Sequence, residues 1–289
     1  MVRIDPMEGE LFQFKTKING VVYKKRELDD KLSSIEEKYK YYTKLDSRDF
    51  LVDIHKFLRT KYLEEIWYTE EPPTLNGNTQ QVCIKLYDDE HTPYELAVEY
   101  GINQFESLVL RNLDEAMIFL FQQDKMVDFA LVKELHKLIL KDIETDKEKI
   151  GQFARNGRKS ADGYPYTDPR VIETNLRNLL KIVNQSLDSA PNDFLNLVKT
   201  ATYFLNRFLK IHPFHDGNGR VARLLFSYLL RRHIIPPVSL VNQCNRDKFQ
   251  EVLTKANDSH VQIQTLYPLL EFVTNRLVET LSIIQDFAN

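Results

Sequence analysis

The chain has 289 residues, of which 43% are hydrophobic and 28% are charged, proportions typical of a globular protein with a sizeable core. Its 39 basic and 42 acidic residues give a net charge of -3, which argues against nucleic acid or an anionic membrane as a partner. Cys83 and Cys244 are too few for a disulfide framework and too far apart for a metal cluster. Because no apolar leader or membrane-spanning run is present in this sequence, we expect a cytoplasmic or nuclear protein.

The N-terminal part predicts a short β-hairpin followed by two helices. Residues 11–15 alternate between apolar and polar side chains, and Asn19-Gly20 is a typical hairpin turn. A charged amphipathic helix is expected over residues 25–42, and a second helix after the capping pair Asp46-Ser47. We therefore expect residues 1–69 to form a small element packed on a core of residues 70–289.

The remaining chain predicts an all-α core. Apolar side chains recur at helical spacing in each of its long segments. One long core helix is expected from Pro93 to Gln122. Further helices are expected over residues 127–143, 171–187, 193–210, 220–232 and 267–287. Residues 151–169 contain few large apolar side chains, so they predict an exposed connection rather than a helix.

One stretch between two strongly apolar helices holds most of the candidate chemistry. Glycines on both sides of Asn218 permit positive φ, so consecutive N–H groups at the start of a helix can form a nest for an anion. Asp216 could hold Mg²⁺ that bridges phosphate oxygens, and Arg220 with Arg223 could bind further oxygens. His212 suits a general base that takes a proton from a hydroxyl. The stretch therefore predicts transfer of a phosphorus-containing group. It reads His212-Pro213-Phe214-His215-Asp216-Gly217-Asn218-Gly219-Arg220.

This stretch resembles the signature of Fic-domain proteins, His-x-Phe-x-(Asp/Glu)-Gly-Asn-Gly-Arg-x-x-Arg, and matches every defined position. The resemblance implies a Fic core over residues 70–289 and transfer of AMP from ATP, with magnesium, to a Ser, Thr or Tyr hydroxyl of a target protein. It implies His212 as the base, Asp216 as the metal ligand and Phe214 as a packing residue. A homodimer is left open. The nucleotide phosphates would be bound by Gly217, Asn218, Gly219, Arg220 and Arg223.

Residues 74–79 lie where many Fic proteins carry an inhibitory segment, (Ser/Thr)-x-x-x-Glu-(Gly/Asn), whose glutamate pairs with the second signature arginine. Gly77 matches this segment, but Asn76 replaces the glutamate and Pro72 replaces the upstream Ser or Thr. A neutral amide cannot form that ion pair, so we expect autoinhibition to be weakened or absent. An ordinary Asn-Gly turn is the alternative interpretation, and Glu106 is a competing candidate for the inhibitory glutamate.

Two further segments are similar to Fic elements that contact the substrates. Residues 151–169 resemble the flap, a β-hairpin that docks the target segment by main-chain pairing. An exposed loop is the alternative. Residues 246–257 resemble the segment that closes over the adenine, where Phe249 and Asn257 match and Gln250 replaces a second aromatic residue. The implied docking residues of the flap are Lys159, Ser160, Ala161 and Asp162.

Three other functions stay open on the sequence. The chain could transfer another nucleotide or a phosphoryl group. It could remove AMP from a target, although related proteins use the inhibitory glutamate to position water for that reaction, so Asn76 predicts poor removal. It could also be a catalytically silent module that binds a target through its flap. The intact His212, Asp216 and Arg223 argue against the silent module.

Overall fold

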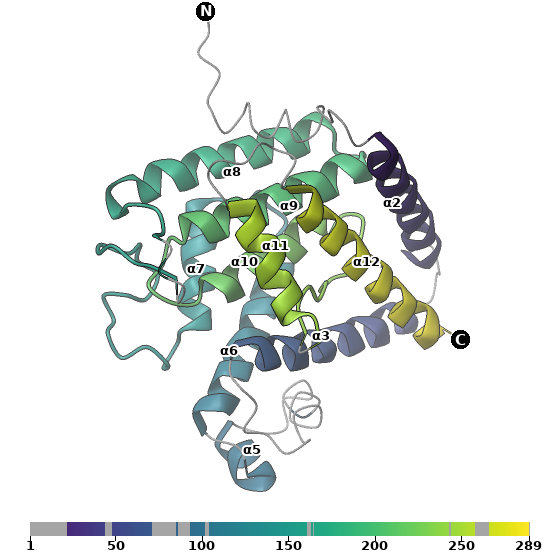
Figure 1. Ribbon diagram of the computed structural model, residues 1–289. Coiled ribbons are helices and arrows are strands. Elements are labelled where there is room, and N and C mark those ends of the chain that lie inside the picture. Colours follow the sequence, from purple (N-terminus) through teal and green to yellow (C-terminus); the bar gives the residue numbers. More distant parts are fainter. Residues whose placement is uncertain are drawn as a thin grey trace, which may run out of the picture.

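The computed structural model of the chain is a bundle of helices (Figure 1). Within its described residues the fold is all-α, as predicted. The described residues are 22–43, 48–70, 85, 93–101, 104–160, 163, 165–242, 244–257 and 266–288. The labelled helices are α2 (Val22–Thr43), α3 (Arg48–Glu70), α5 (Pro93–Tyr100), α6 (Gln104–Phe121), α7 (Phe129–Ile139), the 3-10 turn η1 (Pro169–Val171), α8 (Ile172–Ser189), α9 (Phe194–Ile211), α10 (Asn218–Leu230), α11 (Arg246–Asn257) and α12 (Leu266–Ala288). Among these, no helix has both the length and the apolar character that crossing a membrane needs.

The central helix is α9, which packs against α8, α10, α2, α11 and α12. Its apolar side chains point in several directions, as expected for a helix that is surrounded by others. The Asp193 carboxylate accepts a hydrogen bond of 2.9 Å from the Asn196 N–H and so caps the first turn, which confirms the predicted start of this helix. Its fully buried aromatic side chains are Phe194, Tyr203, Phe204 and Phe208.

The two N-terminal helices pack on this core. α2 contacts α9 and α12, and α3 contacts α6 and α12. On the α2 side, Lys199 Nζ lies 3.1 Å from Asp29 Oδ1, and the lysine is almost fully buried. The β-hairpin expected before residue 25 lies outside the described residues, and the boundary between residues 69 and 70 stays a prediction.

The prediction of a single helix from Pro93 to Gln122 is wrong, because the structure has two helices there. α5 ends at Tyr100, and the following Gly101 has a left-handed φ of +64°, a conformation that ends helices and that glycine adopts readily. The apolar stripe also does not reach the core at this end, since Val98 is 68% exposed and Phe105 is 44% exposed. The next helix, α7, is shorter than expected at both ends. It begins at Phe129, where Asp128 caps it with Oδ1 accepting from the Leu131 N–H at 2.7 Å, and it ends at Ile139 rather than at residue 143.

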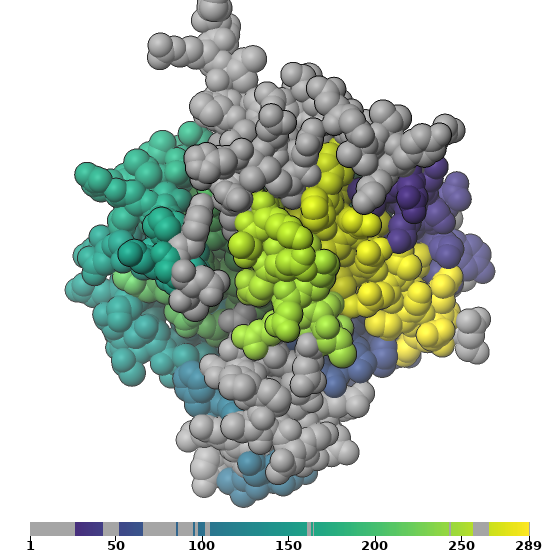
Figure 2. All heavy atoms as spheres, viewed as in Figure 1, coloured from purple at the N-terminus to yellow at the C-terminus, as the bar shows by residue number. Residues whose placement is uncertain are grey.

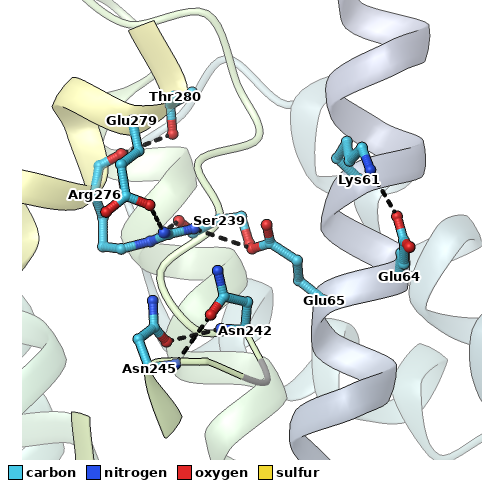
Figure 3. Close-up of polar contacts among 9 residues, drawn as sticks. All are labelled: Lys61, Glu64, Glu65, Ser239, Asn242, Asn245, Arg276, Glu279 and Thr280. Carbon is cyan, nitrogen blue, oxygen red and sulfur yellow. Dashed lines mark hydrogen bonds and ion pairs between the residues drawn. The ribbon is translucent and has the colours of Figure 1, made fainter. Parts of the chain in front are cut away.

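A buried ionic network joins α3 to α12 (Figure 3). Arg276 Nη2 lies 3.3 Å from Glu65 Oε2, and Arg276 Nε donates to the main-chain oxygen of Ser239 at 3.2 Å. The Ser239 hydroxyl donates to the same Glu65 carboxylate, and Arg276 also pairs with Glu279. Burial raises the pKa of Glu65 to about 7, although the charge of Arg276 opposes this shift.

Glu65→Gln is expected to remove a pH-dependent loss of stability. Because the pKa of Glu65 rises from 4.5 to about 7 on folding, the folded chain holds more protons than the unfolded chain in this window, and the free energy of unfolding falls as the pH rises. The difference between wild type and Glu65→Gln should change by on the order of 2 kcal/mol between pH 5 and pH 8. Urea unfolding at the two pH values measures this difference. Glu134→Gln, which alters an exposed pair with Lys137 on α7, is the control, and a pH-independent difference would contradict the assignment.

Candidate active site

The signature residues form the loop between α9 and α10 and the first turns of α10. His212 ends α9 in a left-handed conformation, with φ of 51°, and its N–H donates to the Phe208 oxygen at 2.8 Å. Gly217, with φ of +71°, begins α10. The chain therefore turns sharply at both ends of the loop, and the first N–H groups of α10 face the space beside it. This arrangement suits the binding of an anion.

The side chain of Asn218 closes the loop on itself. Its Oδ1 accepts from the Phe214 N–H at 2.8 Å, and its Nδ2 donates to the Phe214 oxygen at 2.8 Å. Both residues are buried, so the two bonds satisfy main-chain groups that water cannot reach. The side-chain amide of Asn218 is therefore already occupied, and its predicted role in phosphate binding falls to its main-chain N–H.

Charged side chains lie at the start of α10. Arg220 and Arg223 are buried to 6% and 7% exposure, which places two guanidinium groups in the first turns of the helix. Asp216 is at the surface, with 65% of its side chain exposed, and its Oδ2 accepts from Arg220 Nη2 at 3.0 Å. Two buried cations at a helix N-terminus attract phosphate, and the exposed carboxylate lies next to them.

His212 is held in a form that can accept a proton. The ring of Tyr166 stacks on it with centroids 3.6 Å apart and planes 5° from parallel. Burial lowers the pKa of His212 to about 4, and the charge of Arg158 adds to this effect. His212 Nδ1 lies 3.3 Å from the Leu209 oxygen, which favours the tautomer with its proton on Nδ1. Nε2 then carries the lone pair at neutral pH.

Three residues around the loop were not predicted from the sequence. The Arg158 guanidinium donates to the main-chain oxygens of both His212 and Phe214. Tyr166 covers His212, and His136 of α7 stacks on Phe214 with centroids 3.8 Å apart. Burial lowers the pKa of His136 to about 4. The residues come from segments that are distant in the sequence, so no local pattern indicates them.

Comparison with known proteins agrees with this geometry. Residues 126–230, which include the whole loop and α10, match the Fic/DOC family. Over these residues the chain is therefore similar to a Fic domain. Curated relatives called "Protein adenylyltransferase Fic", from Drosophila persimilis and Drosophila pseudoobscura pseudoobscura, are 31% identical to it over 152 residues. That alignment covers 53% of this chain and 27% of each relative, so the chain spans about a quarter of their length.

Solved structures share the fold of residues 126–230 and of the helices around them. A Fic domain containing signaling protein from Bacteroides thetaiotaomicron superposes with a TM-score of 0.71 at 18% identity, covering 89% of this chain and 96% of that one. Fic-1, residues 134–508, from C. elegans superposes with a TM-score of 0.70 at 21% identity, covering 91% of this chain and 72% of that one. At these identities the likeness extends to the fold alone.

The segment expected to form the Fic flap lies along the signature loop. The Ala154 N–H donates to the Pro213 oxygen at 2.9 Å. A single antiparallel bridge joins Lys159 to Pro165, but the described residues here form no strand, so the expected β-hairpin is not seen in them. Among the implied docking residues, Lys159 is exposed and Ser160 is half-buried. Ala161 and Asp162 lie outside the described residues.

The remaining predicted residues lie apart from the loop in sequence. Phe249 of α11 is 3% exposed, and its ring packs on Phe272 of α12 with centroids 5.4 Å apart. Figure 2 shows α11 on the surface next to α12. The buried Phe249 ring therefore belongs to the side of α11 that faces α12. Asn257 ends α11, and its side chain lies outside the described residues, as do Asn76 and Gly77. Glu106 is buried in the first turn of α6.

Proposed function

We propose that this Fic protein is an adenylyltransferase that transfers AMP from ATP to a Ser, Thr or Tyr hydroxyl of a target protein. The observation that carries the proposal is a neutral, half-buried His212 one loop away from a helix N-terminus that holds two buried arginines. A base and a phosphate site at this spacing suit the attack of a hydroxyl on a phosphorus atom. The 31% identity to curated adenylyltransferases supports the same reaction.

His212 Nε2 takes the proton of the target hydroxyl. The hydroxyl oxygen forms a bond to the α-phosphorus of ATP, and the bond from that phosphorus to the pyrophosphate oxygen breaks. Pyrophosphate leaves with the electron pair of the broken bond. The hydrogen bond from His212 Nδ1 to the Leu209 oxygen keeps the lone pair on Nε2, and the stacked Tyr166 ring keeps water from one face of the imidazole.

The phosphates bind at the start of α10. The N–H groups of residues 217–219 point to the anion, and the buried Arg220 and Arg223 neutralise its charge. These donors are fixed before the substrate arrives, because the Asn218 side chain closes the loop. A preformed set of donors stabilises charge that develops on the phosphate oxygens without a cost of reorganisation.

Asp216 fits a single Mg²⁺ that arrives with the nucleotide. Its exposed carboxylate bonds to Arg220 through Oδ2, which leaves Oδ1 for a cation. The described residues contain no cluster of three or more His, Cys, Asp or Glu side chains that could hold a metal ion, and Mg²⁺ commonly takes one carboxylate together with phosphate oxygens and water. When bound, it would neutralise part of the phosphate charge.

The adenine of the nucleotide and the target protein are assigned to two flanking segments. Phe249 and Asn257 of α11 are proposed at the adenine, and residues 159–162 at the target. The bridge between Lys159 and Pro165 supports docking of an extended target segment here, since it gives these two residues the main-chain pairing of a strand. Transfer of another nucleotide is the second candidate. It is favoured by the burial of Phe249 against Phe272, which turns the expected aromatic contact toward the core.

Labelled nucleotides test the proposal directly. The wild-type chain is incubated in a native lysate with Mg²⁺ and ATP that is labelled either at the α-phosphate or at the γ-phosphate. Label that requires the added chain and enters protein from the α position alone supports transfer of AMP, whereas chain-dependent label from the γ position indicates phosphoryl transfer. Labelling by another nucleotide only would favour the second candidate. No labelling with any nucleotide would favour a silent binding module.

Tyr166→Ala should move the acid limb of the pH profile. His212 acts unprotonated, so transfer is lost as the pH falls through its pKa, which burial holds near 4. Without the ring that covers one face of His212, this pKa should rise toward 6.5. Transfer at pH 5.5 relative to pH 7.5 should therefore fall in Tyr166→Ala and stay at the wild-type level in Tyr166→Phe, which keeps the ring. Equal ratios in all three proteins would show that Tyr166 does not bury His212.

Asn76→Glu should restore the missing inhibition. A carboxylate at this position would pair with Arg223 and remove it from the phosphates, which we expect to lower the rate of transfer about 10- to 100-fold, the effect of one charge-assisted hydrogen bond. Initial rates of labelling measure it. Asn78→Glu places the same charge two residues away and should have little effect. If Asn76→Glu turns over at the wild-type rate, residues 74–79 are an ordinary turn.

A further inference from the structure

His136 lies in the last turn of α7 and joins two loops through both nitrogens of its ring. Its side chain is 1% exposed and stacks on Phe214 with planes 11° from parallel. Nδ1 accepts from the Gly151 N–H at 2.9 Å, and Nε2 lies 3.1 Å from the main-chain oxygen of Asp216. A ring that only filled space would not need these two polar contacts, since an apolar side chain of the same shape fills a core better.

The two bonds define the tautomer of His136. The Gly151 N–H can only donate, so Nδ1 must offer its lone pair and the proton must be on Nε2. The Asp216 carbonyl can only accept, and Nε2–H donates to it. The neutral ring satisfies both contacts, and each of its two nitrogens has one hydrogen-bond partner. His136 therefore holds the Asp216 carbonyl in a fixed direction.

That direction also sets the first N–H of the phosphate nest. The carbonyl of Asp216 and the N–H of Gly217 belong to one planar trans peptide, in which the two groups point in opposite directions. Because the carbonyl points to His136, the Gly217 N–H points away from α7. A Cβ built on Gly217 would lie 3.6 Å from His136 Cδ2, so the imidazole also lies against this residue at ordinary contact distance.

We propose that His136 is a positioning residue that aims the Gly217 N–H at the phosphate group of the bound nucleotide. It touches neither the nucleotide nor the hydroxyl, and it acts through the Asp216–Gly217 peptide. The inference rests on the proposed function in so far as a phosphate is the ligand of the nest. It extends that function by adding α7 to the elements that shape the site, beyond the signature itself.

Two variants separate the donor from the ring. His136→Phe keeps a flat ring against Phe214 but loses the donor, whereas His136→Gln keeps an amide donor but loses the stack. Loss of one aligned donor at an anion site typically costs about 100- to 1,000-fold in rate, and a misaligned donor should cost less, so kcat/KM for ATP should fall about 10- to 100-fold in His136→Phe. His136→Gln should remain within about threefold of wild type on the same grounds. If His136→Phe is fully active, or if His136→Gln is the weaker of the two, the proposal is wrong.

The Gly217 amide signal gives a readout that does not depend on transfer. Labelling with carbonyl-13C aspartate and 15N glycine selects the two Asp-Gly pairs of the chain, Asp162-Gly163 and Asp216-Gly217, and Gly163→Ala tells them apart. The Gly217 signal should shift on addition of ADP in wild type and in His136→Gln, and should not shift in folded His136→Phe. A wild-type response in His136→Phe would overturn the proposal. If this variant does not fold, loss of the response in His136→Gln would overturn it.

The two readouts also keep this inference apart from the proposed function. Absence of labelling by wild type with every nucleotide, together with an ADP-dependent shift of Gly217 that His136→Phe lacks, would reject adenylyl transfer and support the positioning role. Active transfer of AMP by wild type, together with an ADP-dependent shift of Gly217 that is the same in His136→Phe, would support adenylyl transfer and reject the positioning role. Thermal unfolding of each variant shows whether the fold is retained.

Discussion

His212→Asn should abolish nucleotide transfer and leave the fold intact. The imidazole is the base of the proposed reaction, and loss of a general base typically lowers a rate about 100- to 10,000-fold. Asparagine is chosen because His212 has φ of 51°, a conformation that Asn tolerates better than most residues, so the variant removes the base with little change in the backbone. Initial rates of labelling, with thermal unfolding of both proteins, measure the effect.

The neighbouring imidazole provides the control for this prediction. His215 lies in the same loop but bears no assigned role, so His215→Ala should keep transfer within a few-fold of wild type. ADP binding should also survive in His212→Asn, because the donors proposed for the phosphates lie at the start of α10. A rate close to wild type in His212→Asn would mean that another group takes the proton, and the assignment of the base would be wrong.

Asn218→Ala should cost both stability and activity. It leaves the N–H and the oxygen of Phe214 without their partners at 2.8 Å in a buried position, which we expect to lower the free energy of unfolding by about 2 to 4 kcal/mol. Transfer should fall further than stability alone explains, because the loop no longer holds its donors. Urea unfolding and labelling below the unfolding transition measure the two effects separately.

An exposed amide serves as the matched control for Asn218. Asn275 of α12 accepts a hydrogen bond of 2.7 Å from Lys31 at the surface, so Asn275→Ala should change the free energy of unfolding by less than about 0.5 kcal/mol. A small effect of Asn218→Ala, comparable to that of Asn275→Ala, would show that the loop keeps its shape without these bonds.

The parts of the fold that were predicted correctly are those that residues close by in the sequence determine. The start of α9 follows from the cap at Asp193, and the start of α10 follows from the glycine at 217, so each could be placed within about two residues. The break at Gly101 was missed because apolar residues continue at helical spacing on both sides of it. Spacing alone does not distinguish a helical glycine from one that adopts a left-handed conformation.

The candidate site divides in the same way. The stretch from His212 to Arg223, which is the loop and the first turns of α10, was predictable because neighbouring residues determine its shape, as the bonds between Asn218 and Phe214 illustrate. Three other residues around the loop were not predictable, because each lies 46 to 80 positions away in the sequence from the loop residue that it contacts. They are Arg158, Tyr166 and His136. Their residue types carry no pattern of their own, and only the packing of α7 and the flap segment brings them to the loop.

The central position of α9 has a consequence for how the protein loses activity. The helix that carries His212 is surrounded by five others, so its amide protons should exchange with solvent only when the whole domain opens. Inactivation by heat and melting of the fold should then occur at the same temperature. Substitutions that stabilise distant core positions would prolong the working life of the site, without any change in its chemistry.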